Sequence, residues 1–117
     1  MNKRQNSVFA IPDLFYIKNT ASIQKKDVEL GSGDIPYVTA SNVNNGIMGY
    51  ITVNHNTPME SGNSIMIGGK TLTITYQEHD YVSNDSHNLS LILKNELYQE
   101  RKIYLFLVAA MIISLSP

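Results

Sequence analysis

The dipeptide Asn45-Gly46 is the strongest local signal in this sequence. Both residues accept positive φ at low steric cost, and the pair is typical of a tight turn next to a strand. It follows Ile35–Thr39, a β-rich run whose Pro36 lies near its start, where a missing backbone N–H is tolerated. We therefore predict a strand over Ile35–Thr39 and a turn at Asn45-Gly46.

More short β-type runs follow this turn. Ser64–Ile67 is expected to be a buried strand that ends at Gly68-Gly69. Over Thr71–Tyr76, apolar residues alternate with threonines, which predicts a half-buried strand with its hydroxyl groups facing outward. A short strand is expected around Tyr81-Val82 and a longer one over Leu89–Leu93. This pattern predicts a domain built mainly on β-sheet.

Two segments have helical character. Ile11–Ile17 opens with a proline that suits a first helical turn, which predicts a short opening helix. Leu97–Leu115 contains neither proline nor glycine and carries apolar residues on nearly every face, which predicts a helix packed on more than one side. The apolar part of this helix is shorter than the roughly 20 residues needed to cross a bilayer. A buried helix is expected, with a membrane-surface helix as the alternative.

The composition excludes several kinds of chemistry. The chain has no cysteine, which excludes a disulfide framework, a thiolate zinc site and a cysteine nucleophile. His55, His79 and His87 lack the spacing of metal ligands, and His79, Asp80, Asp85 and His87 form no patterned acid-base or metal cluster. No S-adenosylmethionine loop, methyltransferase tetrad or nuclease set of carboxylates is present. We expect no enzymatic activity, no metal and no other cofactor.

Charge and length constrain the function further. The 117 residues, 43% of them hydrophobic, suffice for one domain with a modest core. Nine basic and ten acidic residues give a net charge of -1, so no global positive field draws in phosphate backbones. Composition alone therefore argues mildly against nucleic-acid binding. The N-terminus does not have the pattern of a secretory signal, and a cytoplasmic protein is expected.

Several motifs are distinctive in combination. They are Leu14–Ile17 before a Lys-rich loop, Gly33–Thr39 leading into Asn44–Ile47, Gly62–Ile65 with Gly68-Gly69, Tyr76-Gln77, and Asp85–Leu93 with the later helix at Ile103–Ile113. Together they resemble the DNA specificity domains of type I restriction-modification systems and of related fused restriction enzymes. The resemblance extends from about Leu14 to Ile113.

This resemblance implies a single α+β domain over residues 1–117, with a twisted, partly barrel-like sheet, a short N-terminal helix and a C-terminal apolar helix. It implies a target recognition domain without a catalytic group, which reads a half-site of double-stranded DNA for partner methyltransferase and restriction subunits. No membrane partner is expected, and a homodimer could cover the apolar helix. In the family, a polar segment and a closing strand usually follow this helix. Their absence here predicts an incomplete domain.

Ten residues are candidate DNA contacts: Lys25, Lys26, Asn44, Asn45, His55, Asn56, Lys70, Thr71, Thr73 and Gln77. Asparagine pairs bidentately with adenine, and lysine and threonine are common partners of phosphates and bases. Each also has a structural explanation, namely turn geometry for the asparagines of the turn, a solvated charge for the lysines and core packing at Tyr76-Gln77.

A function of another class fits the same residues. Asn- and Thr-rich loops on a small sheet would also suit a β-rich interaction module or a carbohydrate-binding module. Salt dependence separates the two readings, because a DNA reader loses affinity as salt rises, whereas a sugar or protein binder of near-zero net charge hardly responds.

Overall fold

The computed structural model describes residues 14–95 and 99–115. Within these residues the structure has strands, two 3₁₀ helices (η1 and η2) and the α-helix α3. In chain order they are β1 (Phe15–Asn19), η1 (Lys25–Asp27), β2 (Ile35–Val38), η2 (Val43–Gly46), β3 (Ile47–Ile51), β4 (Ser64–Ile67), β5 (Ile74–Gln77), β6 (Val82–Ser83), β7 (Leu89–Leu93) and α3 (Arg101–Leu115). The predicted α+β class is confirmed.

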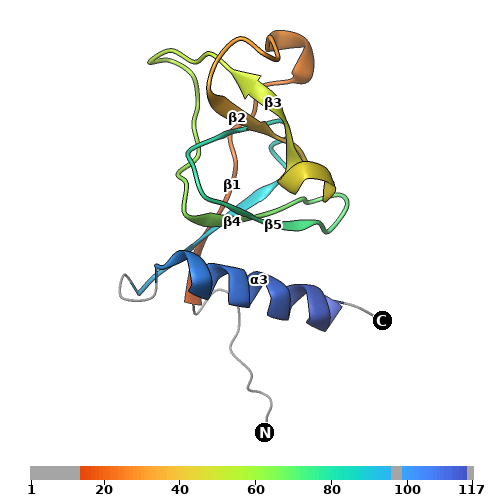
Figure 1. Cartoon of the computed structure of the whole chain (residues 1–117), viewed down its shortest axis with the longest axis vertical. Coiled ribbons are helices and arrows are strands. Elements are labelled where there is room, and N and C mark those ends of the chain that lie inside the picture. Colours follow the sequence, from red (N-terminus) through yellow and green to blue (C-terminus); the bar gives the residue numbers. More distant parts are fainter. Residues whose placement is uncertain (1–13, 96–98, 116–117) are drawn as a thin grey trace, which may run out of the picture.

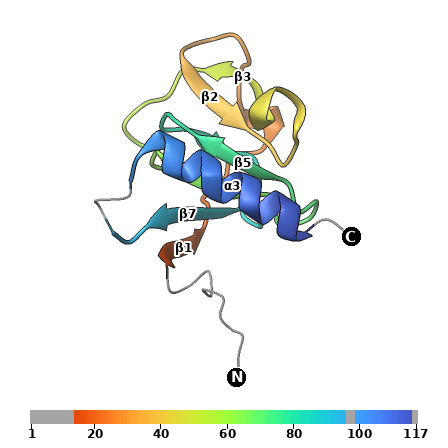
Figure 2. The same ribbon diagram turned by 60° about the horizontal axis from the view of Figure 1, so that its bottom comes forward.

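The strands form two sheets. The first has the order β1-β7-β4-β5, and its neighbours are antiparallel. The second has the order β3-β2-β6, in which β2 pairs antiparallel with β3 and parallel with β6. Figure 1 shows the second sheet above the first sheet and α3 below the first sheet. Figure 2 shows that α3 crosses the face of the first sheet. In the described part of the chain the two sheets do not close into one barrel.

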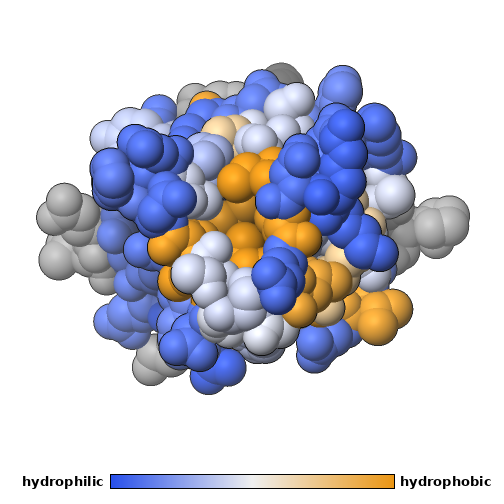
Figure 3. Space-filling model, turned by 90° about the horizontal axis from the view of Figure 1, so that it is seen from above, coloured by the Kyte–Doolittle hydropathy of each residue, from blue (hydrophilic) through white to orange (hydrophobic). Residues whose placement is uncertain are grey.

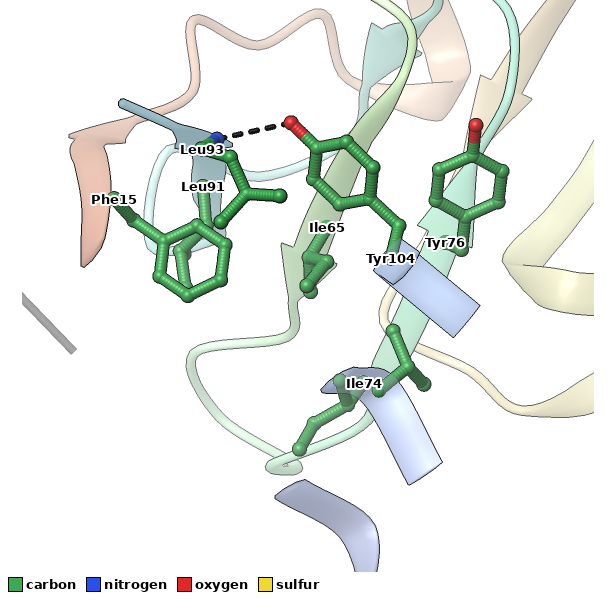
Figure 4. Close-up of a cluster of buried hydrophobic side chains, with 8 residues drawn as sticks. Phe15, Ile65, Ile74, Tyr76, Leu91, Leu93 and Tyr104 are labelled. Atoms are coloured by element: carbon green, nitrogen blue, oxygen red, sulfur yellow. Dashed lines mark hydrogen bonds between the residues drawn. The ribbon is translucent and has the colours of Figure 1, made fainter. Parts of the chain in front are cut away.

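The largest apolar core lies between α3 and the first sheet (Figure 4). Tyr104 of α3 is fully buried, and its hydroxyl oxygen accepts a hydrogen bond of 2.9 Å from the backbone N–H of Leu93. Its ring lies 5.4 Å from the ring of Tyr76, centroid to centroid. Ile65 and Leu91, which are paired across β4 and β7, complete the sheet side of the contact. These residues hold α3 across the sheet.

The two sheets also share buried contacts. Strand β2 is buried on both faces, because Tyr37 packs with Ile51 and Val82 while Val38 packs with Met66 of the other sheet. This explains the continuous apolar run of β2, since a strand covered on both faces needs no polar side. The Tyr37 hydroxyl donates a 2.6 Å hydrogen bond to a loop carbonyl.

A buried carboxylate links the sheets as well. Glu60 is only 2% exposed, and its carboxylate lies 2.9 Å from Nζ of Lys18 in β1 and accepts a 3.0 Å hydrogen bond from the backbone N–H of Ala21. The backbone of Glu60 pairs in both directions with Tyr81, next to β6. A buried charge is tolerated because it is paired and hydrogen-bonded in this way.

Three structural expectations need correction. Phe15–Asn19 form a strand paired with β7, so the second half of the expected opening helix is wrong, and residues 11–13 lie outside the described residues. All of β5 is buried rather than half-buried, since α3 covers one face and η2 contacts the strand as well. Among the described residues, α3 packs one face on the first sheet and leaves Leu105 and Phe106 exposed, so the expected packing on more than one side is wrong. No described helix has the length and apolarity required to span a bilayer.

Candidate nucleic-acid interface

Three loops meet at one end of the sheets, and we call them the loop cluster: residues 39–46 around η2, residues 68–73 between β4 and β5, and residues 84–88 between β6 and β7. Figure 1 shows η2 and the β4–β5 turn side by side to the right of the strands. The Thr71 hydroxyl donates a 3.2 Å hydrogen bond to the Ala40 carbonyl. Lys70 Nζ lies 3.3 Å from the carboxylate of Asp85. Direct contacts therefore connect all three loops.

The first loop follows the predicted Asn-Gly turn. Asn44 and Asn45 have positive φ angles of 50° and 56°, and Gly46 has a φ of 79°. The predicted turn is confirmed, because asparagine and glycine tolerate these angles best. A Cβ on Gly46 would lie 2.7 Å from the Thr39 carbonyl oxygen. The Asn44 side chain is exposed and donates a 3.2 Å hydrogen bond to the Ile47 carbonyl.

Two side-chain amides attach this turn to β5. Asn45 donates a 2.7 Å hydrogen bond to the Tyr76 carbonyl. Gln77, which is 2% exposed, donates hydrogen bonds of 2.9 Å to the Asn45 carbonyl and 3.0 Å to the Thr75 hydroxyl. Both donating groups are thus engaged within the protein. The Asn44 amide, by contrast, is hydrogen-bonded within its own turn at Ile47, so its exposed side chain is the one left to meet a ligand.

The second loop is a tight turn with an unusual tip. The Gly68 N–H donates to the Thr73 carbonyl at 2.8 Å, and the Leu72 N–H donates to the Gly68 carbonyl at 2.9 Å. Leu72 has a φ of 55° and is 64% exposed. A leucine in this left-handed region is uncommon and costs free energy, and such residues often mark functional sites. The half-buried Thr73 places its hydroxyl 3.2 Å from that of Thr71.

In the third loop, one carboxylate receives several donors. Asp85 Oδ1 accepts hydrogen bonds from the His87 backbone N–H at 2.9 Å and from His87 Nδ1 at 2.8 Å, while Oδ2 faces Lys70. The His87 backbone N–H, then its ring, and then Lys70 lower the pKa of Asp85 to about 2. Asp85 is therefore an anion throughout the physiological pH range.

The second and third loops are locked together beneath these side chains. Asn88 is 1% exposed and donates 3.1 Å hydrogen bonds to the Ser83 hydroxyl and to the Asn84 side chain. Its own oxygen accepts a hydrogen bond of 3.4 Å from the Gly69 N–H. A Cβ on Gly69 would lie 2.0 Å from the His87 carbonyl oxygen, so the close approach of the loops requires glycine.

The remaining candidates lie outside the loop cluster. Lys25 and Lys26 are exposed in η1, and His55 and Asn56 are exposed in the loop that follows β3. Figure 1 places η1 and this loop at the end away from α3. Figure 3 looks onto that end and shows an apolar area surrounded by hydrophilic side chains. Partly buried residues of the second core lie at this end, among them Val28 and Val53.

Most of the described cationic side chains have a partner. Besides Lys18 with Glu60 and Lys70 with Asp85, Arg101 lies 3.7 Å from Glu78, and Lys94 Nζ lies 5.7 Å from the ring centroid of Tyr16. A cleft of about 590 Å³ is lined by three carboxylates, which repel phosphate: Asp34, Glu78 and Asp80. In the described part of the chain, no group of three or more His, Cys, Asp or Glu residues could hold a metal ion.

Comparisons with known proteins place the chain in a family. Residues 3–115 match the family model of the type I restriction modification DNA specificity domain, so the chain belongs to that family. Its fold is similar to that of the S subunit of a type I restriction-modification system from M. genitalium, with a TM-score of 0.54 and 18% identity. The likeness covers 92% of this chain and 29% of that subunit. A comparison with curated proteins gives no significant match.

Sequence reasoning did not single out three residues of the loop cluster as candidate contacts. Asp85 and His87 were considered only as members of an acid-base or metal cluster, and Leu72 only as a strand residue. The spacing Asp85-Ser86-His87 is a local signal for an Asx turn, in which a carboxylate accepts a hydrogen bond from the backbone two residues on. The link to Lys70 leaves no signal in the sequence, because it joins residues from different loops.

Proposed function

We propose that residues 1–117 form a target recognition domain that reads a half-site of double-stranded DNA through the loop cluster. In this proposal the domain has no catalytic group and directs partner methyltransferase and restriction subunits to the site. The observation that carries the proposal is that hydrogen bonds and one ion pair join three loops at one end of the two sheets. Membership of the DNA specificity domain family supports it.

The loop cluster suits direct reading of bases. Loops on a rigid scaffold commonly carry binding residues, and a two-stranded ribbon can enter the major groove. Asn44 has the amide that pairs with adenine, and Lys70 has a donor for guanine. The exposed Leu72 side chain offers an apolar contact for the methyl group of thymine. The cluster therefore presents different chemistry for different bases.

The other candidates receive supporting roles in this proposal. Asn45 and Gln77 position the Asn44 turn, because the Asn45 amide donates to the Tyr76 carbonyl of β5 and the Gln77 amide donates to the Asn45 carbonyl. Lys25 and Lys26 would contact flanking phosphates, as would the loop of His55 and Asn56. Thr71 and Thr73 brace the tip of the β4–β5 turn through their hydroxyl groups.

The test begins with selection of bound sequences from a pool of random duplexes by the full chain. We expect one enriched motif, and affinity for it that falls with rising salt. Recovery of no motif would overturn the proposal. Salt-independent binding to a glycan or a protein in place of DNA would favour the interaction module.

A matched pair of variants locates the reading face. Asn44→Gly removes an amide and keeps the positive φ, and Asn56→Gly makes the same change in the loop after β3. Loss of a bidentate contact is worth about 1–3 kcal/mol, so Asn44→Gly should weaken specific binding about tenfold or more. In this proposal Asn56→Gly removes at most a phosphate contact, so it should weaken binding to the selected motif and to random duplexes alike and leave discrimination unchanged. Equal effects of the two variants would show that the loop cluster is not the reading face.

A further inference from the structure

We propose that Lys70 and His87 act together as a base-reading pair and that Asp85 positions both side chains. This inference rests on the proposed function, and it adds a specificity residue and a positioning residue to the same site. Each oxygen of the Asp85 carboxylate contacts one of the two side chains. Oδ1 lies 2.8 Å from His87 Nδ1, and Oδ2 lies 3.3 Å from Lys70 Nζ.

Exposure of the three side chains fits these separate roles. The side chains of Lys70 and His87 are 66% and 68% exposed, whereas that of Asp85 is 28% exposed. Asp85 thus lies beneath two side chains that extend to solvent. The loops that carry them are fixed at their base by Asn88 and by the close approach at Gly69. A pair fixed in this way loses little conformational entropy when it binds a ligand.

The local charge favours base edges over phosphates. With a neutral imidazole, the positive charge of Lys70 and the negative charge of Asp85 cancel. A phosphate that approaches Lys70 also approaches the carboxylate, so its net attraction is weak. A base edge carries no net charge and gains from oriented donors and acceptors. An ammonium group has three N–H donors, so Lys70 can hydrogen-bond to a base while it contacts Asp85.

The carboxylate also determines the tautomer of the neutral imidazole. An ionised Asp85 can only accept hydrogen bonds, so Nδ1 of His87 carries the proton and Nε2 presents a lone pair. Lys70 then supplies a donor and His87 an acceptor. In the major groove, adenine offers the complementary combination of the N7 acceptor and the N6 amino donor.

The test compares Lys70→Met, His87→Ala and Asp85→Asn with the full wild-type chain on its selected motif and on random duplexes. For a base-reading pair, Lys70→Met and His87→Ala each lower affinity for the selected motif about tenfold and leave the salt slope unchanged. Lys70→Met leaves the charge of Asp85 uncompensated, so it also lowers random-sequence affinity, but by a smaller factor, whereas His87→Ala leaves random-sequence affinity unchanged. Asp85→Asn removes a negative charge, so it should raise random-sequence affinity while it lowers specific affinity. A phosphate contact by Lys70 would instead give uniform weakening and a salt slope smaller by about 1, and this result would overturn the inference.

Controls separate failure of this inference from failure of the proposed function. Lys94→Met removes a lysine that lies over Tyr16, outside the loop cluster, and should leave both affinities unchanged. A wild-type chain that selects no motif refutes the proposed function itself. The wild-type chain could instead select a motif that the Lys70→Met and His87→Ala variants discriminate equally well. That result refutes only the base-reading pair. If circular dichroism shows that Asp85→Asn is unfolded, the two exposed variants still decide the question.

Discussion

Replacing Tyr104 with phenylalanine removes one oxygen atom from the contact between α3 and the first sheet. The hydroxyl accepts the backbone N–H of Leu93 at 2.9 Å, and both residues are buried. The aromatic ring and its packing against Tyr76 remain in the variant. The expected loss is therefore that of one hydrogen bond with a buried donor left unpaired, which costs about 1–3 kcal/mol.

Urea unfolding followed by circular dichroism measures this loss. The midpoint should fall while the slope m is unchanged, because the surface exposed on unfolding is the same. The Tm should drop by roughly 4 °C for each kcal/mol in a domain of this size. Tyr50→Phe is the matched control, since Tyr50 is 45% exposed and the same change there should stay within about 0.5 kcal/mol. A Tyr104→Phe variant as stable as wild type would refute the view that this bond helps to hold α3 on the sheet.

Three further predictions concern the loop cluster. Gly69→Ala places a Cβ 2.0 Å from the His87 carbonyl oxygen, so we expect the two loops to separate, with a stability loss of about 1–3 kcal/mol and loss of discrimination in a duplex-binding assay. The pKa of the Asp85 carboxyl is lowered from 3.8 to about 2, so its ionised form stabilises the fold above pH 3.8. This stabilisation is lost as the pH falls towards 2. A carboxyl NMR titration with a midpoint near 4 would contradict this prediction. Leu72→Gly relieves a left-handed backbone conformation that costs about 1–2 kcal/mol, so thermal unfolding should show no loss of stability. The affinity for the selected duplex should fall. A variant that binds this duplex as tightly as the wild-type chain would show that Leu72 does not contact DNA.

Much of the local structure was predictable from single segments. The strand at Ile35–Val38, the turn at Asn45-Gly46 and the strands at Ser64–Ile67 and Leu89–Leu93 are confirmed, as is the helix at Arg101–Leu115. Each depends on a property of a few neighbouring residues, such as tolerance of positive φ or continuous apolar character. Such properties act before any tertiary contact forms, so they can be read along the chain.

The errors have a tertiary cause. Phe15–Asn19 has apolar residues that fit one helical turn, yet it pairs with β7, and the hydrogen bonds of a sheet override a weak helix preference. The threonines near β5 alternate as in a half-exposed strand, but η2 contacts β5 and Thr75 is buried. Alternation indicates which residues share a face. It does not indicate whether another part of the chain covers that face.

The candidate site divides in the same way. Asn44, Lys70 and Thr71 were identified from their types and from the glycines beside them, and all three lie in the loop cluster. Gln77 was identified because its amide could contact a base. Its buried position depends on the turn that packs over it, which the sequence does not reveal.

The amino-acid sequence by itself determined the turn residues, several of the strands and the family, because these follow from local steric preferences and from motifs that lie within short segments. Only the tertiary structure decided which polar side chains meet. The Asp85 carboxylate contacts Lys70 because β4 and β7 are neighbours in one sheet and their turns therefore emerge at the same end. Electrostatic coupling depends on distance in space, and the pairing of strands sets that distance.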